Sequence, residues 1–256
     1  MFAVSSSELL RALQERASRA LPAAHIEHSE GWWLRHAPNC SWWVGSVQPH
    51  TDTSPDELPQ RIIDAEKFYA THGATTRFQI TPGACPEHLD TALATRGYHR
   101  QSPISLQVAS TTRILEPTPT PAPTLRIHVH DRPTSEWFET WHSVHTHADP
   151  HSERAMLDRV KDPSAYASAL IGHDVVAVGR TVADTGWAGV FNMATRPEAR
   201  GKGAARQVLT ALASWASTHE ADHMYLQVEP DNPPALRLYE RAGFREICRY
   251  HYRNAE

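Results

Sequence analysis

The stretch that decides the fold is Arg-Pro-Glu-Ala-Arg-Gly-Lys-Gly-Ala-Ala-Arg, residues 196–206. It joins an apolar run at Trp187–Thr195 to a helical pattern at Gly203–Ser217. Two glycines and two alanines remove side-chain bulk at the turn, so that the backbone can approach a ligand. The helix that follows begins with unpaired N–H groups and the positive end of its dipole, and both favour an anion. Three cationic side chains surround this point: Arg200, Lys202 and Arg206. The turn therefore predicts a binding site for a pyrophosphate.

Two common phosphate-binding loops do not fit this stretch. A Walker-type loop needs Gly-x-x-x-x-Gly-Lys-Ser/Thr, and the spacing here is different. A dinucleotide-binding Gly-x-Gly-x-x-Gly motif could begin at Gly201 and Gly203, but Arg206 stands in place of its third glycine. The stretch instead resembles the Arg/Gln-x-x-Gly-x-Gly/Ala signature of the GNAT superfamily of N-acetyltransferases, through Arg200, Gly203 and Ala205.

A second stretch, residues 223–244, supports the same resemblance. His223–Glu229 alternates apolar and polar residues, which is typical of a half-buried strand. Pro233 and Pro234 suit the first turn of a helix that has Asn232 as its N-cap. The stretch resembles the second GNAT signature, Asn-x-x-Ala-x-x-Leu-Tyr-x-x-x-Gly-Phe. The matching residues are Asn232, Ala235, Leu238, Tyr239, Gly243 and Phe244. The resemblance covers roughly residues 125–256.

The domain organisation follows from a proline-rich segment and from a stretch of the first half that is similar to one in the second half. Alternating prolines at Pro117–Pro123 predict an extended linker at 116–124, between halves at residues 1–115 and 125–256. In the first half, Phe78–Pro82 echoes Leu226–Pro230, but no glycine-rich turn is present. The resemblance thus implies an α/β (α+β) GNAT fold, a mixed central sheet flanked by helices, in two tandem halves. The first half is expected to be degenerate and the second catalytic.

The composition limits the partners that we expect. A formal net charge of −4 argues against a general nucleic-acid binder, which usually carries a basic face. Three widely spaced cysteines predict neither a disulfide framework nor a structural zinc site, and they favour a reducing cytoplasm. No apolar run is long enough to cross a membrane. We therefore expect a cytoplasmic monomer or homodimer with no nucleic-acid or membrane partner.

Two clusters of aromatic and histidine residues are candidates for an acceptor site. Four tryptophans flank a Pro38-Asn39 turn and predict a hairpin with cross-strand aromatic pairs: Trp32, Trp33, Trp42 and Trp43. They could line a substrate cleft or pack between the halves. The densest histidine cluster is His142, His145, His147 and His151. It has no nearby cysteine or tight carboxylate pattern, so no metal is expected. The resemblance implies that this cluster lies on the helix pair that shapes the acceptor pocket in the family.

The resemblance implies acetyl-CoA as cosubstrate and direct attack by an amine in a ternary complex, without a metal. The backbone of the strand before the turn would hold the pantetheine and the acetyl carbonyl, through Met193, Ala194 and Thr195. A preorganised backbone donor there would stabilise the developing oxyanion. Asn232 would also contact the cofactor, although helix capping alone explains an asparagine there. The pyrophosphate would lie on the turn, at Arg200, Gly201, Lys202, Gly203, Ala204, Ala205 and Arg206.

Two residues are candidates for proton transfer. By resemblance, Tyr239 is the general acid that protonates the leaving thiolate; the alternative is a tyrosine of the core. Some protein acetyltransferases carry a glutamate base on the strand before the turn, but Gly189 stands at that position. Glu229 is the best substitute base. The alternatives are a solvated carboxylate at the end of a strand and a chain of water molecules.

The leading function is therefore acetyl-CoA-dependent N-acetylation of a small-molecule amine or an amino-acid-like metabolite. One alternative is N-acetylation of a protein or peptide. Another is a non-catalytic regulator that binds acyl-CoA, which a degenerate first half and an unclear base would fit.

Overall fold

The computed structural model describes residues 6–116, 125–145 and 148–255. These residues form two compact units, and neither is continuous in sequence. Within the described ranges, unit 1 consists of residues 6–105, 151–160 and 248–255, and unit 2 of residues 106–150 and 161–247. Segments 151–160 and 248–255, which the sequence division assigns to the second half, thus lie in unit 1. The proline-rich segment Pro117–Pro123 lies outside the described residues.

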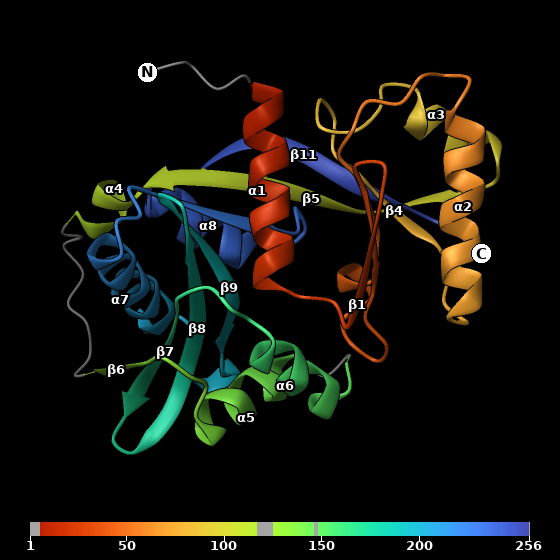
Figure 1. The fold of residues 1–256 in the computed structure, drawn as a ribbon. Helices are drawn as coiled ribbons and strands as arrows, with labels where there is room; N and C mark the ends of the chain where they lie inside the picture. The colour runs from red at the N-terminus through yellow and green to blue at the C-terminus, as the bar shows by residue number, and fades with distance from the viewer. Residues whose placement is uncertain (1–5, 117–124, 146–147, 256) are drawn as a thin grey trace. The chain divides into compact units, whose positions relative to one another are not determined.

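Unit 2 contains the two signature stretches and a mixed sheet. Its strands follow the order β5-β10-β9-β8-β7-β6, in which β9 and β10 are parallel and β6 to β9 are joined antiparallel (Figure 1). The strands are β5 (His99–Ser110, of which residues 106–110 are in this unit), β6 (Arg126–His130), β7 (Ser164–Ile171), β8 (Asp174–Asp184), β9 (Trp187–Thr195) and β10 (His223–Val228). The helices are α4 (Thr111–Leu115), α5 (Ser135–Val144), α7 (Ala204–Thr218), α8 (Pro233–Arg241) and the 3-10 turn η2 (Pro197–Ala199).

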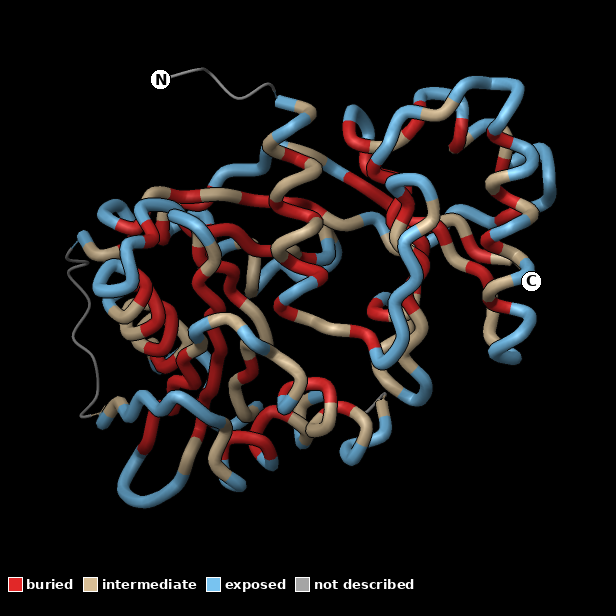
Figure 2. The backbone as a smooth tube through the Cα atoms, in the orientation of Figure 1, coloured by how far each residue is buried: buried red, intermediate tan, exposed pale blue. Residues whose placement is uncertain are grey.

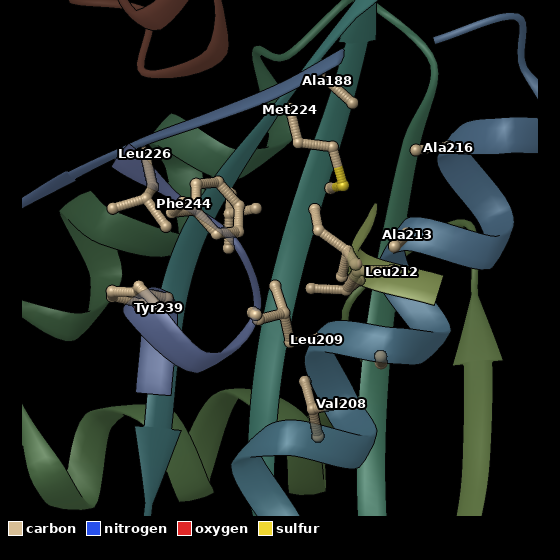
Figure 3. Close-up of a cluster of buried hydrophobic side chains, with 14 of the residues drawn as sticks. Ala188, Val208, Leu209, Leu212, Ala213, Ala216, Met224, Leu226, Tyr239 and Phe244 are labelled. Carbon is tan, nitrogen blue, oxygen red and sulfur yellow. The ribbon is translucent and has the colours of Figure 1, made fainter. Parts of the chain in front are cut away.

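The core of unit 2 lies between the sheet and the apolar face of α7. Val208, Leu209 and Leu212 recur at helical spacing and are fully buried against Ala188 and Met224 of the strands. Figure 3 shows this cluster, to which α8 contributes Tyr239 and the residues after α8 contribute Phe244. Strand β8 is buried along most of its length, whereas β9 is buried at residues 188–190 and at Ala194 and half-buried elsewhere (Figure 2). The core therefore fixes the strand from which the turn at 196–206 begins.

Helix α5 covers the opposite face of the unit 2 sheet. The indole Nε1 of Trp137 donates a hydrogen bond to the carbonyl of Gly179 on β8, at 3.2 Å. The same ring lies edge-on to Tyr166 of β7, with centroids 5.1 Å apart. Thr134 caps the helix by accepting a hydrogen bond from the backbone N–H of Trp137. These contacts anchor α5 over β8 and β9.

Unit 1 has its own sheet and core. Its strand order is β1-β2-β3-β4-β11, and the apolar core includes Trp32, Leu34, Ile62 and Phe78. The strands are β1 (His25–Ser29), β2 (Trp32–His36), β3 (Val47–Pro49), β4 (Arg77–Ile80) and β11 (Arg245–Asn254, of which residues 248–254 are in this unit). The helices are α1 (Ser6–Ala20), α2 (Leu58–Thr71), α3 (Leu89–Thr95), α6 (Pro150–Asp158, of which residues 151–158 are in this unit) and the 3-10 turn η1 (Trp42–Val44).

The predicted tryptophan hairpin is wrong in its register. Strand β2 pairs with β3, and Trp32 lies opposite Pro49 while Trp33 lies opposite Gln48. Trp42 and Trp43 lie in η1, within the connection, where Trp42 packs edge-on against Tyr252 at 4.8 Å. The cause is a connection between β2 and β3 that is longer than the Pro38-Asn39 turn alone. Throughout the described ranges, no helix has the length and apolar character that crossing a membrane requires.

Candidate functional site

The turn after β9 has the geometry of an anion-binding cradle. Gly201 and Gly203 adopt left-handed backbone conformations, with φ of 74° and 80°. A Cβ placed on either glycine would meet nothing within 4 Å, so open space lies over both residues. The glycines are therefore needed for their backbone angles, a reason that the sequence analysis did not give.

The N-terminus of α7 faces the same turn. The N-cap is Gly203, which has no side chain to occupy the backbone donors. Gln207 donates the first bond of the helix, to the carbonyl of Gly203 at 3.1 Å. The N–H groups of Ala204, Ala205 and Arg206 precede that bond and point out of the helix end. Together with the helix dipole they form a site that suits a phosphate group.

The three predicted cations have different surroundings. Arg200 and Lys202 are exposed, and the Nε of Arg200 lies 3.4 Å from the carbonyl of Thr195. Arg206 is half-buried, and its Nη2 donates a hydrogen bond to the carbonyl of Ile114 at 2.8 Å. Burial lowers the pKa of the Arg206 guanidinium, and nearby Arg113 lowers it further. The side chain of Arg206 thus holds α7 to α4, and its backbone N–H lies in the first turn of α7.

Strands β9 and β10 separate before the cradle. Their parallel pairing runs from Trp187–His223 to Val190–Leu226, whereas β9 continues to Thr195. On its other edge β9 remains paired with β8, up to Thr195 opposite Ala177. Met193, Ala194 and Thr195 therefore have one backbone edge beyond the last pair with β10. This is the segment that the sequence analysis assigned to the pantetheine and the acetyl carbonyl.

A β-bulge lies within this segment. Arg180 pairs with Phe191 and Val178 pairs with Ala194, so Gly179 alone faces Asn192 and Met193. Asn192 has a φ of 52°, which is uncommon for a residue other than glycine. The bulge breaks the two-residue period of the strand, and it was not predicted from the sequence.

One histidine of the predicted cluster contacts the same segment. The Nε2 of His145, the residue after α5, lies 3.3 Å from the carbonyl oxygen of Met193. Because a carbonyl only accepts, Nε2 carries the proton of this hydrogen bond. His142 instead stacks on Phe138, and His151 lies in unit 1. His147 lies outside the described residues. Within the part of the chain that is described, no group of three or more His, Cys, Asp or Glu residues could hold a metal ion.

Tyr239 lies on α8 and is buried in the core of unit 2. Its ring packs edge-on against Phe244, with centroids 5.8 Å apart (Figure 3). Burial raises the pKa of its hydroxyl to about 12, so the group is protonated at neutral pH. A protonated hydroxyl is the state that a general acid requires, and both the acid role and the core role agree with this position.

The other two side chains with predicted roles lie in the connection between β10 and α8. Asn232 caps α8, because its Oδ1 accepts a hydrogen bond from the N–H of Ala235 at 3.2 Å. Glu229 is exposed and follows the last residue of β10. Tyr225, four residues before Glu229 on β10, is buried rather than open to solvent. Asn232 and Glu229 remain predictions for cofactor contact and for the base.

The position of the glutamate base in some protein acetyltransferases is closed by packing. A Cβ on Gly189 would lie 2.6 Å from Cζ of Phe191 and 2.7 Å from Cζ of Tyr225. These rings pack edge to face, with centroids 6.0 Å apart. No side chain fits at residue 189, which explains the glycine at this point of β9.

Comparisons with known proteins agree with this geometry. The family model described as "Probable histone acetyltransferase Rv0428c C-terminal" matches residues 7–253. A curated relative, the "Uncharacterized N-acetyltransferase YobR" of Bacillus subtilis (strain 168), is 27% identical over 247 residues, covering 93% of this chain and 96% of the relative.

Two solved structures have the same fold at low sequence identity. A GCN5-related N-acetyltransferase from Kribbella flavida matches with a TM-score of 0.73 and 15% identity, over 99% of this chain and 96% of its own. A tandem GNAT protein from the clavulanic acid biosynthesis pathway matches with a TM-score of 0.68 and 12% identity, over 99% and 97% of the two chains.

Proposed function

The chain belongs to this acetyltransferase family and is an N-acetyltransferase of the GNAT type in a tandem arrangement, and from this premise we propose that it uses acetyl-CoA to acetylate an amine. The proposed acceptor is a small molecule or an amino-acid-like metabolite. One observation carries the proposal: a left-handed glycine turn at a helix N-terminus directly follows a strand that has separated from its parallel neighbour.

The residues of unit 2 fit this cosubstrate. The open space over Gly201 and Gly203 would receive the pyrophosphate, and the N–H groups of Ala204, Ala205 and Arg206 would bind it. Exposed Arg200 and Lys202 would supply positive charge at the same turn. The edge of β9 at residues 193–195 would bind the pantetheine by backbone hydrogen bonds. The chemistry that acetyl-CoA brings is an acyl group activated as a thioester.

The proposed reaction forms one bond and breaks one. The neutral amine attacks the carbonyl carbon, and backbone N–H groups of β9 stabilise the developing oxyanion. As the C–S bond breaks, the hydroxyl of Tyr239 protonates the leaving sulfur. The amine loses its proton to Glu229, or to solvent through water, and Tyr239 is reprotonated from solvent. With its pKa raised to about 12 by burial, the Tyr239 hydroxyl carries the proton that the leaving sulfur needs.

A second candidate is acetylation of a protein or peptide. The description of the matching family favours it. The packing at Gly189 argues against the mechanism of those protein acetyltransferases that use a glutamate there, since Phe191 and Tyr225 fill the space. The small-amine proposal is therefore preferred.

A thiol-release assay tests the proposal directly. The protein is mixed with acetyl-CoA and a panel of small amines, amino acids and their amides, and free CoA is measured. Parallel incubation with a peptide array covers the second candidate. Release that requires a small amine supports the proposal, and labelling of peptides alone would replace it. Tight acetyl-CoA binding without turnover on either panel would indicate a regulator that binds acyl-CoA.

A further inference from the structure

We propose that Arg180 is a positioning residue that fixes the acyl-binding segment of β9 by holding the side chain of Asn192. The inference rests on the proposed function, because it concerns the same backbone at Met193–Thr195. It adds a named residue on β8 that the sequence motifs do not contain.

Arg180 contacts the bulge directly. Its side chain is completely buried, and its Nε donates a hydrogen bond to Oδ1 of Asn192 at 3.0 Å. Its guanidinium lies over the ring of Phe191, 5.1 Å from the centroid. One side chain thus holds two consecutive residues of the bulged strand, through a charge-assisted hydrogen bond and a cation–π contact.

The neighbouring residue of β8 holds the bulge from the other face of the sheet. A Cβ on Gly179 would lie 2.8 Å from Cγ1 of Val208, and still closer to Sδ of Met193. Met193 therefore packs directly over the backbone of Gly179, toward α7. Because successive residues of a strand point to opposite faces, Gly179 and Arg180 hold Met193 and Asn192 from opposite sides.

The choice of asparagine at residue 192 supports a specific role for this pair. Glycine adopts a φ of 52° without steric cost, whereas asparagine there is only tolerated. A side-chain oxygen at this point is useful because it accepts from Arg180. Burying a guanidinium costs desolvation free energy that an apolar side chain would not, so fold stability alone does not account for Arg180. A role in setting the direction of the backbone after the bulge explains why Arg180 and Asn192 occur together.

The test separates positioning from folding with three variants and one control. Asn192→Gly keeps the left-handed backbone but removes the acceptor of the hydrogen bond. Arg180→Met removes the donor, and Arg180→Lys restores a cation and an N–H donor. Glu220→Gly is the control, because Glu220 is an exposed residue of unit 2 with a φ of 58° in the connection between α7 and β10. For each protein, Tm, the Kd for acetyl-CoA by calorimetry, kcat and KM are measured.

We expect Asn192→Gly and Arg180→Met to weaken acetyl-CoA binding and to lower kcat/KM by about 10- to 100-fold, since small misplacements of reacting groups have effects of this size. Their Tm should remain near that of the parent, Arg180→Lys should recover part of the loss, and Glu220→Gly should change neither Kd nor kcat. The proposal is overturned if Asn192→Gly folds normally and keeps the parent's Kd and kcat/KM. If the parent protein itself does not bind acetyl-CoA, the proposed function fails instead.

Discussion

The imidazole Nε2 of His145 lies 3.3 Å from the carbonyl oxygen of Met193, so a side chain that follows α5 already bonds to the proposed acyl-binding strand. A carbonyl oxygen has two acceptor positions, and a pantetheine amide would share this one or displace the imidazole. The residue that ends α5 as its C-cap therefore contacts the part of β9 where the cosubstrate is proposed to bind.

This contact predicts a change in acetyl-CoA affinity. His145→Ala should lower the KM for acetyl-CoA, because the carbonyl of Met193 no longer has a competing donor. The expected factor is about 2- to 10-fold, which corresponds to the net free energy of one hydrogen bond. His142→Ala is the matched control, since His142 lies in the last turn of α5, close to His145 in sequence, but stacks on Phe138. Initial rates at varied acetyl-CoA measure both. A raised KM in His145→Ala alone would mean that the imidazole helps to bind the cosubstrate.

The glycine turn offers a test in which strain and binding are separated. Gly203→Ala and Gly172→Ala place the same methyl group at φ values of 80° and 62°, both in open space. Each should lose about 1–2 kcal/mol of folding free energy, because both force a left-handed alanine. Only Gly203→Ala should also weaken acetyl-CoA binding, since Gly172 lies in the turn between β7 and β8. Urea unfolding and calorimetry give the two quantities, and equal Kd values in the two variants would remove the turn from the binding site.

Much of unit 2 could be predicted because its signals are local. Strand β9 has the predicted bounds, α7 is shifted by one residue at each end from the predicted Gly203–Ser217, and α8 begins at the predicted Pro233. Proline, glycine and an N-cap asparagine mark these boundaries in the sequence itself. The family and the fold followed from the same motifs, and the comparisons confirm both.

The details that shape the candidate site depend on contacts between distant residues. The contact of His145 with Met193 joins residues 48 positions apart, and the densest histidine cluster was the only hint of it. The reason for Gly189 is two aromatic rings, one of them from another strand. The bulge at Asn192 interrupts the two-residue period from which strands are predicted. Composition and spacing carry no information on such pairings, so these features required the structure.

Tyr239→Phe should reduce turnover without weakening cosubstrate binding. Loss of a general acid typically costs 10²- to 10⁴-fold, so kcat should fall by about that factor. The Kd for acetyl-CoA should be unchanged, and so should Tm, because phenylalanine keeps the ring contact with Phe244. Single-turnover rates and calorimetry measure the two effects. A kcat equal to that of the parent would assign Tyr239 to the core alone.

Gly189→Ala should destabilise unit 2 through overpacking. The new methyl group would lie within 2.7 Å of the rings of Phe191 and Tyr225, which are packed against one another. The expected loss is about 1–3 kcal/mol of unfolding free energy. Gly45→Ala is the control, because its nearest contact would be 3.4 Å away. Combining Gly189→Ala with Phe191→Leu should recover part of the loss, whereas equal unfolding curves for Gly189→Ala and the parent would contradict the packing at this point.

Buried tyrosines predict a loss of stability at alkaline pH. Burial raises the pKa of Tyr239 and of Tyr252 to about 12, and that of Tyr250 rises in the same direction. An unfolded tyrosine has a pKa of about 10, so the unfolded state releases its proton first and the folded state retains it. Their contribution to stability is therefore complete below pH 10 and is lost as the pH rises toward 12. Each such group lowers the unfolding free energy by about 1.4 kcal/mol per pH unit within that window. Urea titrations from pH 8 to 11.5 measure the slope, and Tyr239→Phe should reduce it by one group's share; an unchanged slope would mean that this hydroxyl ionises in the folded protein as it does in the unfolded chain.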